Sequence, residues 1–373
     1  MKLLKKLGFL SAFLLPLGLL KSYYLGGYWN FSTVLFVYGV FPLLDFWAGS
    51  DPQNPDEAQV TALSEARYFR FVTYAWVFVQ VGMVIWGASV FALGTLTFWP
   101  AVGFLLGMAT VTGGIGITVA HELGHRAEPI ERFYCQVLLL TVCYMHFYIE
   151  HNQGHHVHVA TPRDPATSRK NETFYAFWFR TVTGSWRSAW RLETARLHKK
   201  GQATWSIHNR MVWYAVLPLL FCAALTAGLS GYAGHWLWRV PVFFFTQSLL
   251  AFSLLELVNY IEHYGIVRRQ VATGRYERVN ALHSWNANPL LSNFYLFQLQ
   301  RHADHHAHAN RRYQVLRHVE ESPQLPAGYP AMILVALLPP LWFRLMNLRL
   351  EAWQRQHVTS DEAPVNSKAN LRI

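Results

Sequence analysis

Charged residues are scarce in this chain. Of its 373 residues, only 14% are Asp, Glu, Lys or Arg, whereas 52% are hydrophobic and 16% are aromatic. This composition excludes an ordinary soluble protein and indicates a membrane protein. Basic residues interleaved with aromatic ones are missing outside the membrane-adjacent segments, which argues against nucleic acid as a partner.

Cysteine is also rare. The three cysteines, Cys135, Cys143 and Cys222, lie in apolar runs and show no Cys-x-x-Cys spacing. This excludes a disulfide framework and a paired-cysteine metal site, and we interpret the three thiols as packing residues. Internal repeats are lacking too. We predict one membrane-embedded domain over residues 1–353 and a disordered polar tail over residues 354–373.

Long apolar runs dominate what is present. Each has close to the ~20 residues that cross ~30 Å of hydrocarbon. The first lacks a small-residue cleavage site and leads into the second, so we expect a retained hairpin rather than a signal peptide. We predict an all-α integral membrane protein with a bundle of six transmembrane helices. The predicted spans are residues 3–25, 31–47, 71–93, 99–120, 212–230 and 240–260.

Two further apolar runs are weaker. The run 133–149 is short for a span, and the run 331–346 contains Pro339 and Pro340. We expect both to be interfacial or re-entrant. Of the 32 Lys and Arg, only Lys21 and Arg239 then fall on one side of the membrane. The positive-inside rule therefore predicts cytoplasmic termini and cytoplasmic segments 121–211 and 261–353.

Histidine motifs gather on this predicted cytoplasmic side. They are "HELGH" at 121–125, "EHNQGHH" at 150–156, "NYIEHYG" at 259–265 and "RHADHH" at 301–306. Spacings of three and four residues on a helix place side chains on one face. A lone histidine would be an ordinary polar residue, but four groups at ligand spacing predict a metal site for two ions. Its ligands would be His121, His125, His151, His155, His156, His263, His302, His305 and His306.

Imidazole ligands leave the metal open among zinc, copper, nickel and iron. The "HELGH" motif also matches H-E-x-x-H, in which Glu122 would activate water for a zinc protease. Such a protease needs one further ligand, and the other six histidines would then have no role.

The four motifs, with "VHVATPRDPATSR" after the second and "AHANRRYQ" after the fourth, resemble those of the integral-membrane alkane 1-monooxygenases. The resemblance extends from "FPLLDFWAGSDPQNP" to "LPAGYP". It implies two non-haem iron ions held by the nine histidines, and hydroxylation of a terminal methyl group of an n-alkane with O2. It also implies that electrons come from a rubredoxin, either a separate protein or a domain outside this chain, which is reduced by a reductase. We expect the protein in a bacterial cytoplasmic (inner) membrane.

Several acids and one further histidine lie beside the motifs. Neutral imidazoles leave the charge of two metal ions uncompensated, so nearby carboxylates would orient the ligands and tune the ions. Salt bridges with Arg126, Arg163 or Arg301 are the alternative role for these acids. The expected second layer around the ligands is Glu122, Glu150, Asp164, Glu262, Asp304 and His283.

Alkanes gain about 0.8 kcal/mol per CH2 on leaving water, so a channel between the spans would collect them from the bilayer. Packing or lipid contact is the competing role for each of its predicted wall residues. These are Trp47, Phe71, Tyr74, Trp76, Phe104, Gly113, Gly114 and Ile117.

An arginine-rich stretch after the sixth span could steer an acidic electron donor or attract anionic lipid headgroups. Its candidates are Arg268, Arg269, Arg275, Arg278, Arg311, Arg312 and Arg317. The alternatives to alkane hydroxylation are a xylene-type monooxygenase, an acyl desaturase or hydroxylase, a zinc protease, and a metal-binding or transport protein.

Overall fold

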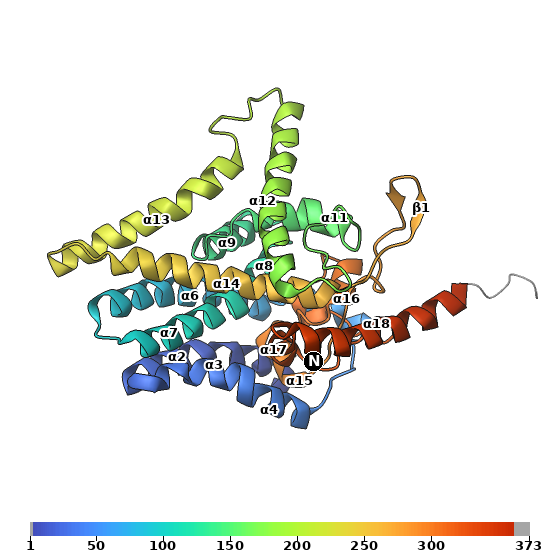
Figure 1. Ribbon diagram of the computed structural model, residues 1–373, viewed down its shortest axis with the longest axis horizontal. Coiled ribbons are helices and arrows are strands. Elements are labelled where there is room, and N and C mark those ends of the chain that lie inside the picture. Colours follow the sequence, from blue (N-terminus) through green and yellow to red (C-terminus); the bar gives the residue numbers. More distant parts are fainter. Residues whose placement is uncertain (1–2, 362–373) are drawn as a thin grey trace, which may run out of the picture.

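A computed structural model describes residues 3–361 of the chain. Six helical segments are long and apolar enough to cross a membrane, and they run side by side in a bundle (Figure 1). Their number confirms the prediction of six spans. The segments are Lys5–Leu25, Gly27–Ala48, Arg67–Leu93, Phe98–Gly124, Arg210–Ala233 and Arg239–His263.

The first two segments form the expected hairpin and are each built from shorter helices. The reversal occurs at Gly26, whose φ of 74° suits glycine because no Cβ crowds the backbone. The elements are α1 Leu3–Gly8, η1 Phe9–Phe13, α2 Leu14–Leu25, η2 Gly27–Phe31, α3 Ser32–Leu35, η3 Phe36–Val40 and α4 Phe41–Ala48.

The other four spans are mostly continuous. They comprise α6 Arg67–Leu93, the succession α7 Phe98–Ala109, η4 Thr110–Ile117 and α8 Thr118–Gly124, then α13 Arg210–Ala233 and α14 Arg239–His263. In η4 the backbone is π-helical, so this span bulges locally. This irregular stretch contacts α14 extensively and ends directly before "HELGH".

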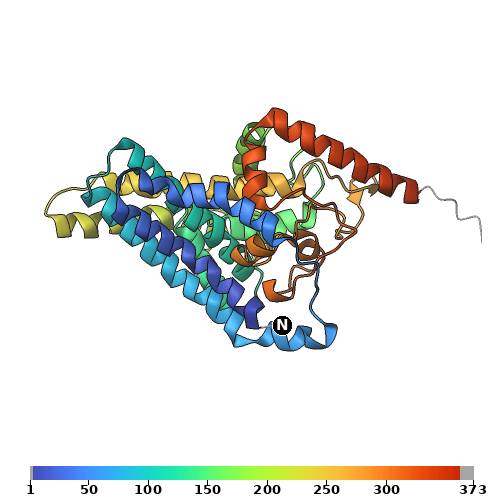
Figure 2. The same ribbon diagram turned by 90° about the horizontal axis from the view of Figure 1, so that it is seen from below.

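The remaining elements gather at one end of the bundle, where α12 runs across the direction of the spans (Figures 1 and 2). They are α5 Glu57–Glu65, α9 Pro129–Leu140, α10 Phe147–Glu150, η5 His151–His155, α11 His156–His158, α12 Phe174–Lys199, β1 Gln270–Ala272, β2 Arg275–Tyr276, α15 Leu290–Tyr295, α16 His302–Ala307, η6 Tyr313–Val315, α17 Tyr329–Ala336 and α18 Pro339–Asp361. Strands β1 and β2 pair antiparallel in a hairpin. Which side of the membrane this end faces stays a prediction.

The two weaker apolar runs do not form continuous spans. The run 133–149 is divided between α9 and α10, with Cys143 at a positive φ of 54° between them. The run 331–346 is divided between α17 and α18, and α18 begins at Pro339. Helix α18 continues to Asp361, so the predicted disordered tail is helical over residues 354–361. The rest of that predicted tail lies outside the described residues.

Small residues let η4 approach its neighbours closely. A Cβ on Gly113 would lie 2.7 Å from Ala251 Cα of α14, and one on Gly116 would collide with the Gln80 side chain of α6. The Gln80 amide also donates to Thr141 Oγ1 at 2.8 Å. Helices in a membrane associate through such packing and interhelical hydrogen bonds. These contacts hold the span that carries His121 against α6 and α14.

Replacing Gly113 with Ala should therefore destabilise the bundle. The added methyl group has no space against the backbone of Ala251, and overpacking of this kind costs about 1–3 kcal/mol. Thermal unfolding in detergent micelles would show a lower Tm. The matched control is Gly82→Ala in α6, where no atom lies within 4 Å of the new Cβ. Equal Tm values for the two variants would contradict the close approach.

Candidate metal centre

Nine histidines from five elements converge at the end of the bundle. Helix α8 and the turn after it supply His121 and His125, and α14 supplies His263. The others come from η5, α11 and α16. They separate into a five-histidine centre, His121, His125, His151, His156 and His305, and a four-histidine centre, His155, His263, His302 and His306. Within each centre the ligand atoms all lie within 4.8 Å of one another.

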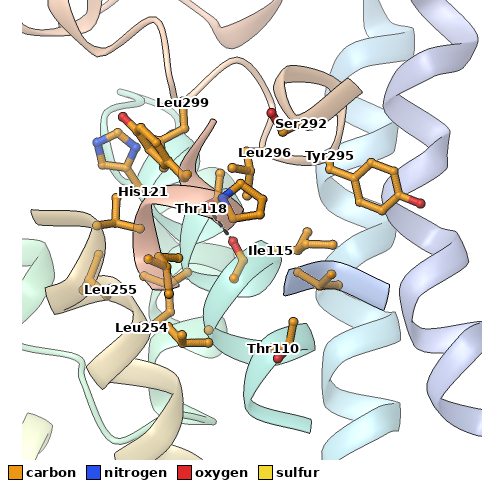
Figure 3. A pocket seen from close by; sticks show the side chains of 18 of the residues that line it. Thr110, Ile115, Thr118, His121, Leu254, Leu255, Ser292, Tyr295, Leu296 and Leu299 are labelled. Atoms are coloured by element: carbon orange, nitrogen blue, oxygen red, sulfur yellow. Dashed lines mark hydrogen bonds between the residues drawn. The ribbon is translucent and has the colours of Figure 1, made fainter. Parts of the chain in front are cut away.

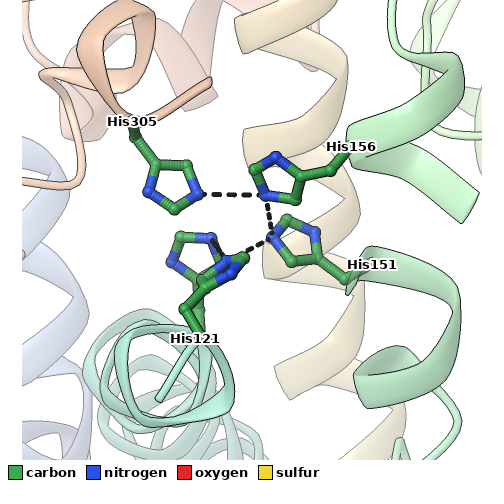
Figure 4. Close-up of side chains that lie close together, drawn as sticks. His121, His151, His156 and His305 are labelled. Carbon is green, nitrogen blue, oxygen red and sulfur yellow. Dashed lines mark hydrogen bonds between the residues drawn. The ribbon is translucent and has the colours of Figure 1, made fainter. Parts of the chain in front are cut away.

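The five-histidine centre is a chain of close Nε2 atoms. His121 and His125 are 3.3 Å apart, His125 and His151 are 3.1 Å apart, and His151 and His156 are 3.0 Å apart. His305 completes it at 3.2 Å from His156. Figure 4 shows the rings of His121, His151, His156 and His305 turned toward a common point.

The four-histidine centre has the same geometry and is completely buried. The Nε2 atoms of His302 and His306 are 2.9 Å apart, and those of His302 and His263 are 3.3 Å apart. His155 Nε2 lies 3.3 Å from His306 Nε2. All four rings therefore present Nε2 inward.

The sequence left open which rings share an ion. Helical spacing places His151 and His155 on one face, but His151 shares its centre with His156 and His155 belongs to the other centre. The reason is that η5 is π-helical, so residues five apart come into line. Likewise His302 and His306 share one centre, and His305 turns to the other.

These separations fit metal ligands. Two imidazoles at right angles, each about 2.1 Å from one ion, have nitrogens about 3.0 Å apart. Without ions, so many inward Nε2 atoms would crowd lone pairs or protons together. Burial, reinforced by neighbouring histidines, holds the pKa of His125, His151, His305 and His306 well below its ordinary value. The rings are therefore neutral at pH 7, which is the form that binds metals.

Asp164 supports the four-histidine centre from outside. Its Oδ2 lies 2.9 Å from His155 Nδ1, the ring nitrogen opposite the inward Nε2. Burial lowers the pKa of His155, but the charge of Asp164 outweighs it, so the pKa is raised above its ordinary value. A carboxylate in this position orients the ring and increases its basicity. The loop 159–167 thus holds His155 in place.

Of the other predicted acids, one contacts a ligand ring and three do not. Glu262 Oε2 lies 3.2 Å from His302 Nε2. Glu122 is instead paired with Arg126 at 2.8 Å, and Asp304 binds Arg311 and the backbone N–H of Arg317. Glu150 is buried, and burial followed by the charge of Asp164 raises its pKa to about 8. Only Asp164 and Glu262 of the five have a hydrogen-bond or ion-pair contact with a ligand ring.

His283 does not reach the centres. Its Nδ1 accepts the Asn280 N–H at 3.1 Å, and its Nε2 lies 3.4 Å from Glu277. It therefore belongs to the segment that follows the β hairpin. Sequence proximity to "NYIEHYG" suggested a role at the metal site, but the chain turns away through that hairpin before reaching His283.

An apolar cavity of about 80 Å³ reaches the histidines. In Figure 3, Leu254 and Leu255 on one side and Tyr295 on the other surround a strip from Thr110 to His121. His151 and His302 also line it, so it reaches both centres. Sequence reasoning missed Tyr38, Leu254, Val258, Tyr295, Leu296 and Ile333, which line it too. No sequence signal distinguishes these residues from ordinary packing.

The residues predicted for the channel lie in different places in the structure. Gly113, Gly114 and Ile117 line the cavity. Trp47 and Phe71 instead point outward with 76% and 68% of their surface exposed, where lipid would contact them. Three others serve packing or hydrogen bonding: Tyr74 donates to Glu131, Trp76 donates to Gln80, and Phe104 is buried against Trp86.

Most of the arginines proposed for donor docking have structural partners. Arg312 forms a buried pair with Glu131 at 3.0 Å, Arg311 pairs with Asp304, and Arg317 pairs with Glu57 at 2.6 Å. Arg268 is buried and donates to the backbone oxygens of Val157 and Glu277. Arg269 is exposed and lies 3.7 Å from Glu277. Arg275 and Arg278 are exposed in or beside the β hairpin.

Comparison with known proteins places this arrangement in a family. Residues 94–336, which carry the histidines from His121 to His306, match the model of the fatty acid desaturase family. Alkane 1-monooxygenase 2 of Pseudomonas aeruginosa is 43% identical over 94% of this chain and 93% of its own length. Alkane 1-monooxygenase 2 of Alcanivorax borkumensis is 44% identical over 87% of this chain and 84% of its own. The chain belongs to the alkane 1-monooxygenase family.

A more distant relative acts on a different substrate class. The hydroxylase component of a xylene/toluene monooxygenase from Pseudomonas putida is 27% identical over 95% of this chain and 91% of its own length. The alkane 1-monooxygenases are therefore clearly more similar to this chain. Membership in the family confirms the resemblance that the histidine motifs indicated.

Removing one histidine from either centre should lower the bound metal. His263→Ala takes one of four imidazoles from a buried centre, and we expect the metal-to-protein ratio, measured by mass spectrometry, to fall by about one half. His146→Ala is the matched control, because the His146 side chain is buried, has no hydrogen-bond partner and belongs to neither centre. A His263→Ala variant with the unmodified ratio would contradict the four-histidine centre.

Proposed function

We propose that this protein hydroxylates the terminal carbon of medium- to long-chain n-alkanes, at two iron ions held by the nine histidines. The observation that carries the proposal is the apolar cavity that reaches both histidine centres. In the overall reaction one oxygen atom of O2 enters a terminal C–H bond, giving a 1-alkanol. The other atom leaves as water after taking up two electrons and two protons.

The cavity suits a substrate without polar groups. The Thr110 and Thr118 hydroxyls that line it donate to the carbonyls of Leu106 and Gly114, each at 2.8 Å. Their donors are thus satisfied within their own helix, and the remaining lining is largely aliphatic. Burial of about 0.8 kcal/mol per CH2 would hold an alkane there and exclude water. Because His121, His151 and His302 line the cavity, one end of the alkane chain would lie beside them.

The elongated lining also separates the alkane proposal from an aromatic substrate. The cavity follows one span past Thr110, Gly114 and His121, a lining that an extended methylene chain can follow and a substituted ring cannot fill. The identities of 43% and 44% to alkane 1-monooxygenases, against 27% to the xylene/toluene enzyme, agree with this.

The geometry disfavours a zinc protease. Glu122 would have to activate water in the H-E-x-x-H motif, but it forms a buried ion pair with Arg126 at 2.8 Å. His121 and His125 share their centre with three more histidines. A catalytic zinc site has three protein ligands and an open position, so five imidazoles are too many for it.

Iron bound by the two centres would supply the activation of O2. Imidazole and carboxylate donors are the ligand types of non-haem iron oxygenases. The chain's own contribution is to aim nine rings inward, to exclude water from the cavity, and to place the terminal methyl group beside the rings. We infer that both termini and the metal site face the cytoplasm of a bacterial inner membrane, as the distribution of basic residues predicts.

We infer that a rubredoxin, reduced by its reductase, supplies the electrons. Arg275 and Arg278 would attract an acidic carrier. Anionic lipid headgroups are the competing partner of these side chains. The test measures how fast rubredoxin reduces wild type and Arg278→Ala at several salt concentrations. If the carrier docks at Arg278, the variant should be reduced more slowly and with a weaker dependence on salt, whereas equal rates would favour the lipid headgroups.

Purified protein with O2, n-octane and reduced rubredoxin should form 1-octanol. We expect about two irons per chain, and we expect activity to disappear when a chelator removes the iron and to return when ferrous iron is added. Gas chromatography would identify the product. Activity that persists without iron would contradict the proposal, whereas p-xylene or an acyl substrate converted in place of octane would favour the alternatives.

Gly114→Leu should shorten the range of alkanes that are oxidised. A Cβ on Gly114 meets no atom within 4 Å, so the larger side chain would enter the cavity. Gly114 lies seven residues before His121, roughly 10 Å along a helix. We expect kcat/KM to fall about tenfold or more for hexadecane and much less for octane.

The control for this change is Gly82→Leu, which adds the same side chain to exposed space on α6. It should leave the chain-length profile unaltered. Equal losses for octane and hexadecane in Gly114→Leu would show that this cavity is not where the alkane chain lies.

A further inference from the structure

Two carboxylates approach the four-histidine centre from different sides of its rings. Asp164 contacts His155 at Nδ1, the nitrogen turned away from the centre. Glu262 Oε2 instead lies 3.2 Å from His302 Nε2, the nitrogen turned toward it. The two acids therefore cannot have the same role.

The environment of His302 makes the difference clear. Its Nε2 is 2.9 Å from His306 Nε2 and 3.3 Å from His263 Nε2, so it lies within the cluster of donor atoms. Its Nδ1 is buried and has no hydrogen-bond partner. A carboxylate that only oriented this ring would accept a hydrogen bond from Nδ1, as is usual for metal-bound histidine. Glu262 leaves that nitrogen unsatisfied and joins the inward atoms.

The spacing is that of two ligands on one ion. Donors at right angles, each about 2.1 Å from an ion, are about 3.0 Å apart. The 3.2 Å between Glu262 Oε2 and His302 Nε2 matches this as well as the nitrogen pairs do. We propose that Glu262 is a fifth protein ligand of the metal ion in the four-histidine centre. This inference rests on the iron-binding part of the proposed function.

Glu262 is held for this role by its surroundings. Tyr329 Oη donates to Glu262 Oε1 at 2.6 Å, which leaves Oε2 to face His302. The backbone oxygen of Glu262 accepts the Trp285 N–H at 2.8 Å. Only 2% of the Glu262 side chain is exposed. The carboxylate is thus held through Oε1, and the backbone that carries it is held by Trp285.

The assignment gives both centres five protein ligands and different charge. The five-histidine centre has neutral imidazoles alone, whereas Glu262 brings a negative charge to the other ion. Glu262 and Tyr329 both line the apolar cavity, so this ligand lies on the side from which the alkane arrives. The two ions would therefore differ in charge, and the carboxylate would border the position of the terminal methyl group.

The test compares Glu262→Gln with wild type in the full chain, purified in detergent and loaded with 57Fe. Iron per chain and the Mössbauer spectrum are measured. We expect two irons and two quadrupole doublets in wild type. In Glu262→Gln we expect either loss of about one iron, or two irons with one doublet altered and the other unchanged. Two irons with the wild-type spectrum would overturn the proposal.

The matched control is Glu256→Gln. Glu256 lies on the same helix and is equally buried, but its oxygens accept hydrogen bonds from Tyr144, Thr181 and Asn259. It should keep two irons and the wild-type spectrum, which separates ligand loss from a general effect of removing a buried carboxylate. The same spectral change in Glu256→Gln would overturn the assignment to Glu262.

If Glu262→Gln does not fold, Tyr329→Phe carries the test. Loss of the Tyr329 hydroxyl removes the hydrogen bond to Glu262 Oε1 and so changes the electron density that the carboxylate offers to the metal. One doublet should then shift while both irons remain. An unchanged spectrum would overturn the proposal. Octane hydroxylation is assayed separately. The two proposals can fail separately. If wild type holds two irons and forms no octanol, the hydroxylase function is contradicted. If Glu262→Gln still changes the iron spectrum in that case, the assignment of Glu262 as a ligand is supported.

Discussion

Nine buried imidazole rings directed at two points form the constraint on which this protein depends. Neighbouring Nε2 atoms are separated by 2.9–3.3 Å. Rings so close cannot all be protonated, because their charges would repel in a medium of low dielectric constant. A neutral ring carries one proton, on Nδ1 or Nε2, so two facing Nε2 atoms share at most one hydrogen bond, whereas a bound cation would accept the lone pair of every inward nitrogen. The metal site and the fold of this end of the bundle are thus one energetic unit.

The helical irregularities serve this convergence. The π-helical stretch η4 precedes His121, and the π-helical turn η5 carries His151 and His155. Regular α-helix would have placed His151 and His155 on one face, yet they belong to different centres. Such turns occur frequently at functional sites. Gly113 and Gly116 let η4 pack closely against α14 and α6, so the irregular backbone is supported by its neighbours.

The cavity and the metal centres complement each other in polarity. The hydroxyls of the lining threonines donate to backbone carbonyls of their own helix. They therefore offer no free donor to the cavity, which is an apolar path bounded at one end by imidazoles and Glu262. Leaving water for this path lowers the free energy of a hydrocarbon, whereas a product's hydroxyl group would lose its hydrogen bonds to water there. This contrast favours entry of alkane and departure of alcohol.

The buried pair of Glu122 and Arg126 joins the "HELGH" segment to the loop of Asn310 and Arg311.

The sequence by itself determined the number of spans, the nine histidines and the family. Each of these depends on local signals: about 20 apolar residues in a row, and imidazoles at helical spacing. Only the tertiary structure decided which ring joins which centre, because the π-helical turn at His151–His155 leaves no mark in the residue pattern. It also decided that Trp47 and Phe71 face outward while Leu254 and Tyr295 line the cavity. In a membrane every face of a span is apolar, so hydrophobicity does not distinguish lipid contact from substrate contact; the rotation of each helix against its neighbours does.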